Sequence, residues 1–594
     1  MPRREPHMRA GRTTLCRIAA LVFAAACAVA AAVTLAQAGL TAGFGLWDAV
    51  RVALIFVTTG WLAWGAAQAF LGLPPLGRGR VAPVLKGAPP TAVLMPICNE
   101  DAVQGAARLA AIRDSALSAG LSVDFAILSD TFDPDALGRE RTAFAPLLAD
   151  SRDGARVFYR NRTDRSGRKA GNIEDFIRRS GAAYDYVVIL DADSLMEGET
   201  IRHLIARMEA DPTLGLLQTL PKIVGATSFF GRAMQFSANF HSPVFARGQA
   251  RIQGATGPFW GHNAIVRVDA LARCCGLPEL SGPPPFGGTI LSHDYVEAAL
   301  LARGGWRVEV DPRIEGSFEE GPDNLLAFAR RDRRWCQGNL QHIRLLGAPG
   351  LRGWSRFVFV QGILSYLVSV AWAAFLIASA LATVTASSPD YFPMAYQLFP
   401  VFPDDRTTQI VALAVGVGGL LLLPKFTILA ESVLTGRAAG FGGAARAAGS
   451  VVAEILVTAL IAPLMLMYQS RAVAEVFSGR DGGWPATQRG EGRLSLAESW
   501  RAGRWIALSG VLATAATYWL SPDLIWWLMP VTLPMIAAPV LIWLTSQPLT
   551  DAVFTVPDER APSAVIAAYR RNLDPGAATR EAGDVPIRRY ARSA

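Results

Sequence analysis

Residues 187–194 read VVILDADS, so that four apolar residues lead directly into two carboxylates one residue apart. A short apolar run of this kind predicts a buried strand, and Asp191 and Asp193 would then lie at its carboxyl end. Mg²⁺ and Mn²⁺ prefer hard oxygen ligands and are usually bound by one or two carboxylates together with substrate phosphates. The pattern therefore indicates a divalent-cation clamp, although a solvated turn after a strand would have the same composition.

The rest of the chain is too apolar for an ordinary soluble protein of its length. Of 594 residues, 51% are hydrophobic and only 18% are charged, which predicts membrane-spanning segments. The net charge of +8 comes with arginines that flank apolar runs, as in the positive-inside rule, so we expect no nucleic-acid partner. Six cysteines and six histidines are scattered along the chain and indicate neither a disulfide framework nor a histidine metal site.

Two apolar runs near the N-terminus, 16–38 and 48–72, have the length of membrane spans. Basic residues precede the first run, namely Arg3, Arg4, Arg9, Arg12 and Arg17, which predicts a cytoplasmic N-terminus. Because a second span follows at once, a retained helix is favoured over a cleaved signal peptide. Residues 1–75 are therefore expected to form a cytosolic N-terminus and two transmembrane helices.

Residues 76–350 have the alternating pattern of a soluble α/β domain. Short β-rich runs are separated by charged helical stretches, and this alternation predicts βαβ units around a sheet with parallel strands. The β-rich runs are Val93–Met95, Phe125–Leu128, Val157–Tyr159, Tyr186–Leu190 and Leu214–Gln218. The domain would end in a basic amphipathic helix, Asn324–Leu346, at the membrane surface. Because two spans precede it, this domain is expected to be cytosolic.

Apolar runs resume after residue 351 and continue to residue 545. They cover 356–384, 409–434, 448–468, 504–521 and 523–545. The Arg-rich tail 546–594 is expected inside the cell, which requires an even number of crossings. Segment 448–478 contains Glu454 and ends in a charged stretch, so we expect it to be interfacial or re-entrant and the true spans to number about six. Two half-spans there would raise the number to about eight.

Polar residues also follow the other predicted strands, at the sheet edge where ligands of open α/β sheets bind. Asn99 and Glu100 follow the first strand, Asp130 follows the second, and Lys169 lies in a basic turn that opens a helix. Such a turn offers cations and backbone N–H groups to a phosphate. Further along lie the motifs FWGHN at 259–263, SHD at 292–294 and Arg334-Trp335.

This order of motifs resembles the inverting family 2 glycosyltransferases, in particular the membrane-embedded processive synthases of cellulose and hyaluronan. The resemblance covers residues 91–340. It implies a multi-pass α-helical membrane protein with a cytosolic glycosyltransferase domain of GT-A type, which has a Rossmann-like mixed sheet. It further implies that Asp294 is the catalytic base that takes the proton of the acceptor hydroxyl, and that Asp191 and Asp193 bind Mg²⁺ or Mn²⁺.

The same resemblance assigns the other site residues to two groups. Those expected to bind the nucleotide sugar are Asn99, Glu100, Asp130, Lys169, Asp191, Arg334 and Arg489. Those expected to bind the acceptor are Trp260, His262, Asn263 and Trp335, with Trp335 as a stacking platform. From the residues alone, Asp294 could instead be a helix N-cap, and Arg334 and Trp335 could belong to a membrane-surface helix.

Two departures from the family pattern bear on the acceptor. His293 stands where the processive synthases usually have Glu, and Arg331 stands where they have Gln. Segments 293–298, 330–342 and 482–489 are similar instead to the synthases of osmoregulated periplasmic glucans in Gram-negative bacteria. This similarity implies UDP-glucose as donor and a growing β-1,2-glucan chain that crosses the lipid bilayer of the bacterial inner membrane toward periplasmic glucan-processing proteins.

Residues 482–490 contain a candidate gating loop, in which Trp484, Thr487 and Arg489 would close over the bound nucleotide. An ordinary polar loop is the alternative. Three other functions stay open on the sequence. They are synthesis of another polymer of the cellulose or hyaluronan kind, transfer of a single sugar to a lipid carrier by the same aspartates, and a transporter or receptor with a nucleotide-regulated domain. The small number of ionisable residues in the apolar runs disfavours transport.

Overall fold

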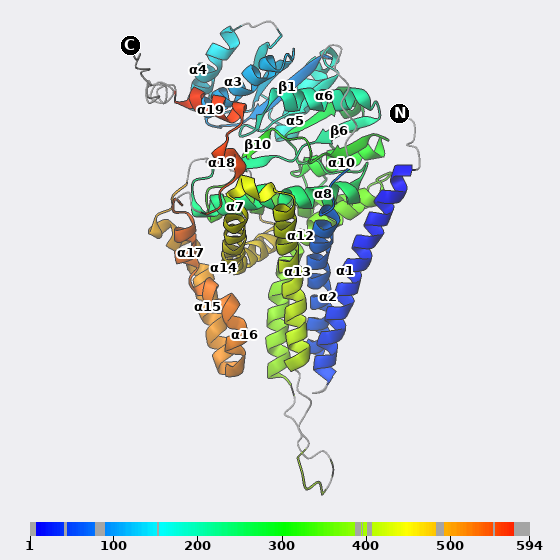
Figure 1. Ribbon diagram of the computed structural model, residues 1–594, viewed down its shortest axis with the longest axis vertical. Coiled ribbons are helices and arrows are strands. Elements are labelled where there is room, and N and C mark those ends of the chain that lie inside the picture. The colour runs from blue at the N-terminus through cyan, green and yellow to red at the C-terminus, as the bar shows by residue number, and fades with distance from the viewer. Residues whose placement is uncertain are drawn as a thin grey trace, which may run out of the picture.

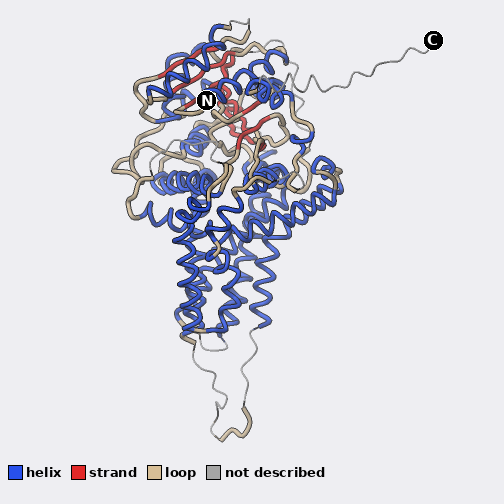
Figure 2. Tube along the Cα trace, turned by 90° about the vertical axis from the view of Figure 1, so that its left-hand side faces the viewer, coloured by secondary structure: helices blue, strands red, loops and turns tan. Residues whose placement is uncertain are grey.

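The computed structural model divides the chain into two layers. The residues it describes are 8–40, 44–77, 89–150, 154–386, 394, 396–400, 407–482, 492–549 and 553–574. An α/β domain forms one layer and a bundle of long helices forms the other, with shorter helices at the boundary between them (Figure 1). The described strands all lie within the α/β layer (Figure 2).

The α/β layer is built on a seven-stranded sheet with the order β3-β2-β1-β4-β8-β6-β9. Its strands are β1 (Thr91–Ile97), β2 (Asp124–Ser129), β3 (Val157–Asn161), β4 (Tyr186–Ile189), β6 (Leu214–Gln218), β8 (Ala264–Arg267) and β9 (Arg307–Val310). β1 pairs in parallel with β2 and β4, whereas β8 is antiparallel to β4 and β6. The mixed sheet expected for a GT-A domain is confirmed, and its first four strands and β6 coincide with the predicted β-rich runs.

Helices cover both faces of this sheet, namely α3 (Ala102–Ser118), α4 (Pro134–Ala149), α5 (Arg168–Ser180), α6 (Gly198–Ala210), α9 (Val268–Cys274) and α10 (His293–Arg303). Side chains of a strand alternate between the faces, as the pleat requires. Val93 and Met95 of β1 enter the core on the side of α3 and α6, whereas Leu94 enters the core on the side of α5 and α10. Burial on both faces explains why β1 and β4 read as continuous apolar runs.

A second sheet, with the order β5-β10-β7, lies between the main sheet and the helical bundle (Figure 1). Its strands are β5 (Leu195–Met196), β7 (Lys222–Val224) and β10 (Ser317–Glu320). The helices at the boundary include α7 (Phe229–Phe240) and α8 (Ser242–Gln253), which follow β7, and α11 (Leu325–Gln341), which follows β10. α11 is the helix predicted at the end of the domain, and its N-cap Asn324 accepts a hydrogen bond from the backbone N–H of Ala327 at 2.9 Å. Its place at a membrane surface stays a prediction.

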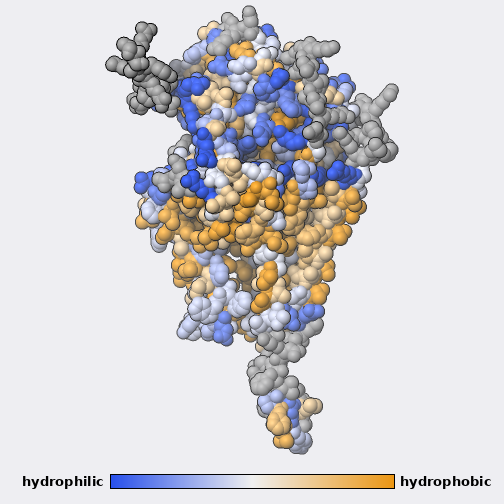
Figure 3. Space-filling view, viewed as in Figure 1, coloured by the Kyte–Doolittle hydropathy of each residue, from blue (hydrophilic) through white to orange (hydrophobic). Residues whose placement is uncertain are grey.

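The bundle contains α1 (Met8–Leu40), α2 (Leu46–Gly72), α12 (Gly353–Val384), α13 (Thr407–Leu434), α14 (Ala444–Phe477), α15 (Leu496–Leu520), α16 (Ile525–Ile536) and α17 (Ala538–Thr545). Among the described residues, five of these helices, α1, α2, α12, α13 and α14, are long and apolar enough to cross a membrane. A sixth span results if the pair Pro522–Ile536 and Ala538–Thr545, bent by 58°, is counted as one. Apolar side chains cover the upper part of this layer, directly below a polar boundary (Figure 3).

The length and hydropathy of two bundle helices differ from what their predicted roles require. α14, predicted as interfacial or re-entrant, passes the length and hydropathy test for a span, whereas α15, predicted to cross, is not among the five. Figure 1 nevertheless draws α14 in the upper part of the bundle near α7, while α15 and α16 run to its lower end. The interfacial assignment of α14 and the even number of crossings therefore stay predictions.

After the bundle the chain returns to the α/β layer. α18 (Pro557–Arg560) and α19 (Ala564–Leu573) lie beside β10 and α3 (Figure 1). Short 3₁₀ helices complete the described elements, at Gly181–Ala183, His342–Leu345, Arg437–Phe441 and Pro522–Leu524. The sequence predicted residues 546–594 only as a tail, so a folded segment on the α/β layer is a finding of the structure.

Candidate active site

A cavity of about 1840 Å³ begins where β1, β2 and β4 end and continues to the helical bundle. The predicted site residues that line it are Glu100, Asp130, Lys169, Asp191, Asp193, Trp260, His262, Asp294, Arg334 and Trp335. Trp61 of α2 and Gln361, Ser365 and Tyr366 of α12 line its other end. One cavity therefore joins the sheet edge to helices of spanning length.

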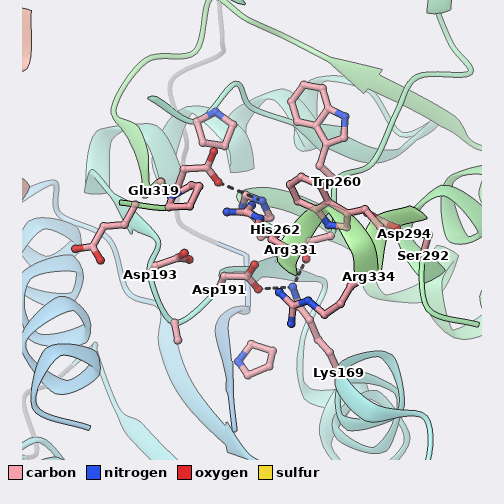
Figure 4. Close-up of a pocket in the computed structure, with 18 of the residues that line it drawn as sticks. Lys169, Asp191, Asp193, Trp260, His262, Ser292, Asp294, Glu319, Arg331 and Arg334 are labelled. Atoms are coloured by element: carbon pink, nitrogen blue, oxygen red, sulfur yellow. Dashed lines mark hydrogen bonds and ion pairs between the residues drawn. The ribbon is translucent and has the colours of Figure 1, made fainter. Parts of the chain in front are cut away.

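Asp191 and Asp193 lie on the turn that follows β4. Ser194 closes this turn, because its backbone N–H donates to the Asp191 carbonyl at 3.0 Å and its Oγ accepts from the Asp191 N–H at 2.9 Å. The Lys169 ammonium donates to the Asp191 carboxylate and, at 2.7 Å, to the carbonyl of Gly261 (Figure 4). The positively charged side chain of Lys169, from the first turn of α5, is thus held at the turn that carries Asp191 and Asp193.

The two aspartates fit a divalent cation that the substrate helps to coordinate. Their carboxylates supply hard oxygen ligands at the edge of an open cavity. Within the described ranges, no group of three or more His, Cys, Asp and Glu side chains could hold a metal ion, so the two aspartates would leave coordination positions for the substrate. This matches Mg²⁺ or Mn²⁺, which commonly take one or two carboxylates and complete their coordination with phosphate and water.

A third carboxylate, which the sequence analysis missed, lies beside this pair. Glu319 of β10 faces the cavity, and its Oε2 lies 3.5 Å from Nε2 of His262 (Figure 4). Burial raises the pKa of Glu319, His262 and Arg331 oppose that rise, and the charges of Asp193 and Asp191 add to it. The acidic pair Glu319-Glu320 at a strand end was the available signal, but β10 has no alternating pattern to mark it as a strand.

Asp294 lies in the first turn of α10, next to the Lys169 contact. Ser292 is the N-cap residue, so the N-cap alternative for Asp294 is wrong. A Cβ added to Gly261, whose φ is +84°, would lie 3.6 Å from Oδ2 of Asp294 and 3.7 Å from Nζ of Lys169. The glycine therefore allows the backbone to pass close to both side chains. Burial raises the pKa of Asp294, while the neighbouring charge of His293 lowers it.

One face of α11 lines the cavity on the side where the acceptor is expected to bind. Trp335 is 42% exposed, and the guanidinium of Arg331 lies 4.5 Å from the centre of its ring. Next to Trp335 on the helix surface, the buried Asp332 anchors α11, because it accepts from Tyr366 of α12 at 3.1 Å and from Gln469 of α14 at 3.0 Å. An anchored helix with an aromatic side chain in the cavity is suited to hold a sugar chain.

Three predicted residues are placed differently from the expectation. Asn263 does not line the cavity, and its amide donates to Ser317 at 2.9 Å and to the carbonyl of Phe318 at 3.1 Å. Asn99 lies outside the cavity lining too.

Asp130 lines the cavity, but Arg162 binds both of its carboxylate oxygens, at 2.6 and 2.8 Å, and Asn172 donates to one of them at 3.0 Å. The nucleobase of the donor could therefore reach the Asp130 carboxylate only beside these contacts. Trp484, Thr487 and Arg489 lie outside the described residues.

Comparison with known proteins identifies relatives along most of the chain. Residues 92–274 match the family described as Glycosyl transferase family 2, and residues 186–403 match Glycosyl transferase family group 2. The chain is 53% identical over 562 residues to the glucans biosynthesis glucosyltransferase H of Cereibacter sphaeroides, with 94% of each chain covered. It is 40% identical over 554 residues to the protein of the same name from Bradyrhizobium diazoefficiens, covering 89% of this chain and 74% of the relative.

A solved structure shows a weaker likeness. The mannosyltransferase PcManGT from Pyrobaculum calidifontis, in complex with GDP-Man and Mn²⁺, aligns with a TM-score of 0.40 and 17% sequence identity. The alignment covers 65% of this chain and 98% of that chain.

Proposed function

Because the chain belongs to the family 2 glycosyltransferases, among the glucans biosynthesis glucosyltransferases H, we propose that it extends a β-1,2-glucan with glucose from UDP-glucose. The names of the relatives support glucosyl transfer into a glucan. The similarity of segments 293–298 and 330–342 to the periplasmic glucan synthases supports the donor and the linkage.

One observation carries the assignment of the site. Lys169 joins the Asp191 carboxylate to the carbonyl of Gly261, and Gly261 lies directly beside Asp294. The candidate metal turn, a phosphate-binding cation and the candidate base are therefore held within a few contacts of one another. Such closeness supports an in-line displacement, in which the base and the leaving group act on one carbon at the same time.

Each side chain then has a role in the transfer. Asp294 accepts the proton of the acceptor hydroxyl as that oxygen bonds to the anomeric carbon, and the bond to the diphosphate breaks with inversion. Lys169 and Arg334, both in the cavity lining, neutralise charge on the departing UDP. A divalent cation held by Asp191 and Asp193 would supply further positive charge to the diphosphate. Trp260 and Trp335 hold the acceptor sugars against the base.

The position of the cavity supports extension and export of the chain by one protein. Its lining passes from Asp294 to Gln361, Ser365 and Tyr366 of α12, which offer hydrogen-bonding groups to a sugar chain on a helix of spanning length. We infer that the catalytic layer faces the cytoplasm. The glucan would then cross the bacterial inner membrane, and periplasmic proteins would receive it on the other side. The Arg-rich N-terminus supports this orientation.

The test is synthesis by the purified, detergent-solubilised protein with Mg²⁺ and one UDP-sugar at a time, followed by product sizing and digestion with linkage-specific glucanases. We expect a long β-1,2-glucan from UDP-glucose and far less product from Asp294→Asn. Asp269→Asn serves as the matched control, because Asp269 lies on the exposed side of α9 and pairs with Arg273. A product of one sugar on lipid, or a polymer of another linkage, would contradict the proposal.

A further inference from the structure

Residues 553–574, here the return segment, connect the helical bundle to the catalytic layer. Phe554 is buried, with ring centres 5.9 Å from Phe229 and 5.8 Å from Phe236 of α7, and its backbone N–H donates to Ser450 of α14 at 3.2 Å. The Glu559 carboxylate pairs with Arg232 of α7 at 2.8 Å. The first half of the return segment is therefore fixed to the boundary helix α7 and to α14.

The second half of the return segment is part of the catalytic core. Val565 and Ile566 of α19 are fully buried in the same hydrophobic core as Leu109 and Ile112 of α3. Asn572 closes the other end of the contact, because its amide donates to the carbonyl of Ala107 at 3.1 Å. α19 is thus bound to α3 along its length (Figure 1).

A buried arginine links α19 to the acidic turn. Arg108 of α3 is 2% exposed, and one of its nitrogens donates to the carbonyl of Ala192, between Asp191 and Asp193, at 2.9 Å. The other terminal nitrogen donates to Tyr569 of α19 at 2.9 Å and to Glu320 of β10 at 2.5 Å.

The Tyr569 ring also lies under this guanidinium, 4.9 Å from it. Burial raises the pKa of Tyr569 to about 12, so its hydroxyl stays protonated. This hydroxyl also donates to the Glu320 carboxylate at 3.5 Å.

We propose that the return segment positions the Asp191–Asp193 turn for a divalent cation and a nucleoside diphosphate, with Tyr569 as the positioning residue. The proposal rests on the proposed function, in which these aspartates bind the cation. Tyr569 orients Arg108, and Arg108 orients the backbone that carries both carboxylates. Tyr569 and Leu573 also line the cavity beside this turn, so α19 closes part of its wall against water.

The Asp191–Asp193 turn needs such support because the proposed cation site is open. Two carboxylates on a turn hold their geometry only if the turn itself is held, and partners outside the coordination sphere commonly change metal affinity by about 10-fold to 100-fold. Arg108 is the hydrogen-bond donor that reaches the middle of the turn, since it bonds Ala192. The guanidinium also donates to Gln104 of α3 at 3.0 Å. Fixed in one orientation by the Tyr569 ring and by acceptors on Gln104, Tyr569 and Glu320, it loses less freedom when it bonds Ala192.

The test is Mn²⁺ titration of the full-length protein in detergent at saturating UDP, with free Mn²⁺ followed by its electron paramagnetic resonance signal. We expect Tyr569→Ala to weaken Mn²⁺ binding about tenfold and Tyr569→Phe, which keeps the ring, to weaken it less. Arg571→Ala is the matched control, because Arg571 is an exposed residue of the same helix. Thermal unfolding of each variant reports whether the fold is retained.

The outcomes separate this proposal from the one on which it rests. Asp193→Ala with unchanged Mn²⁺ binding would contradict the cation site itself. If Asp193→Ala abolishes binding while Tyr569→Phe and Tyr569→Ala bind as tightly as the parent, only the role of the return segment is wrong. An equal loss in Arg571→Ala would also overturn it, since the effect would not depend on Tyr569. Should Tyr569→Ala unfold, Tyr569→Phe decides the question.

Discussion

Asp294 combines burial with a neighbouring cation, and this combination defines its chemistry. A carboxylate that leaves water becomes a stronger base, because desolvation disfavours its charged form. Lys169 and His293 lie close enough to lower the pKa of Asp294 in turn, so the group can stay ionised and still accept a proton. Such a balance is typical of a general base.

Asp294→Asn should slow transfer strongly while leaving the nucleotide site intact. Asparagine has nearly the same shape but cannot take the acceptor proton, and a lost general base costs about 10²- to 10⁴-fold in rate. We expect kcat to fall by that amount and the Kd of UDP to change little, as measured by release of UDP and by equilibrium binding. Turnover close to that of the parent would remove Asp294 from the role of base.

The pH dependence of transfer should report the same residue. Burial alone would lower the pKa of His293, but the charge of the nearby Glu297 raises it, so His293 keeps its proton to higher pH than an ordinary histidine. When charged, it lowers the pKa of Asp294. His293→Gln removes this positive charge, and the pKa of Asp294 then rises. Because the base acts only when deprotonated, the acidic limb of kcat against pH should move to higher pH. A limb that stays in place, or moves to lower pH, would contradict this account.

At the scale of elements, α11 decides how the acceptor is held. Its Asp332 side chain is fixed to α12 and α14 through Tyr366 and Gln469, and its Arg333 side chain pairs with Glu475 of α14 at 3.1 Å. The side that carries Trp335 faces the cavity. α11 therefore behaves as a rigid support, and a change at Trp335 should alter the hold on the sugar chain without loosening the helix.

Trp335→Ala should shorten the product. Loss of the aromatic platform costs about 1.4 kcal/mol in chain binding, which corresponds to about tenfold faster release at an unchanged rate of transfer. Product sizes on a gel at saturating UDP-glucose measure the effect, and Trp335→Phe, with a smaller ring, should give intermediate lengths. Products of normal length from Trp335→Ala would return Trp335 to a role in packing against Arg331.

The catalytic elements that the sequence predicted best were those with strong local patterns. β1, β2 and β4 are buried on both faces, so their apolar runs were unmistakable. β10 was missed because it has only four residues and reads Ser-Phe-Glu-Glu, and with it Glu319 was missed. α19 was not predicted, because it is only ten residues long and follows the bundle in an Arg-rich stretch.

At the scale of the whole molecule, the number of membrane crossings decides which side of the membrane the catalytic layer faces. With an even number, residues 394–400 and the return segment lie on opposite sides of the membrane. We expect a cysteine at Leu398, which is 87% exposed, to react with an impermeant maleimide in intact cells. A cysteine at Arg571 should react only in inverted vesicles, in a chain whose six natural cysteines are replaced. Reaction of both positions from one side would overturn the proposed topology.

Local patterns were enough to predict helices of spanning length, an α/β domain and which acids end its strands, because hydrophobic burial acts on neighbours in sequence. The glycosyltransferase family came from the resemblance of the motifs. Tertiary structure alone brought Lys169 onto Asp191 and Gly261, and turned Asn263 away from the cavity. It alone brought Tyr569 to Arg108 across 461 residues and Glu320 to it across 212. Contacts over such separations depend on how whole elements pack, and a hydrogen bond between distant residues leaves no periodic trace in the chain.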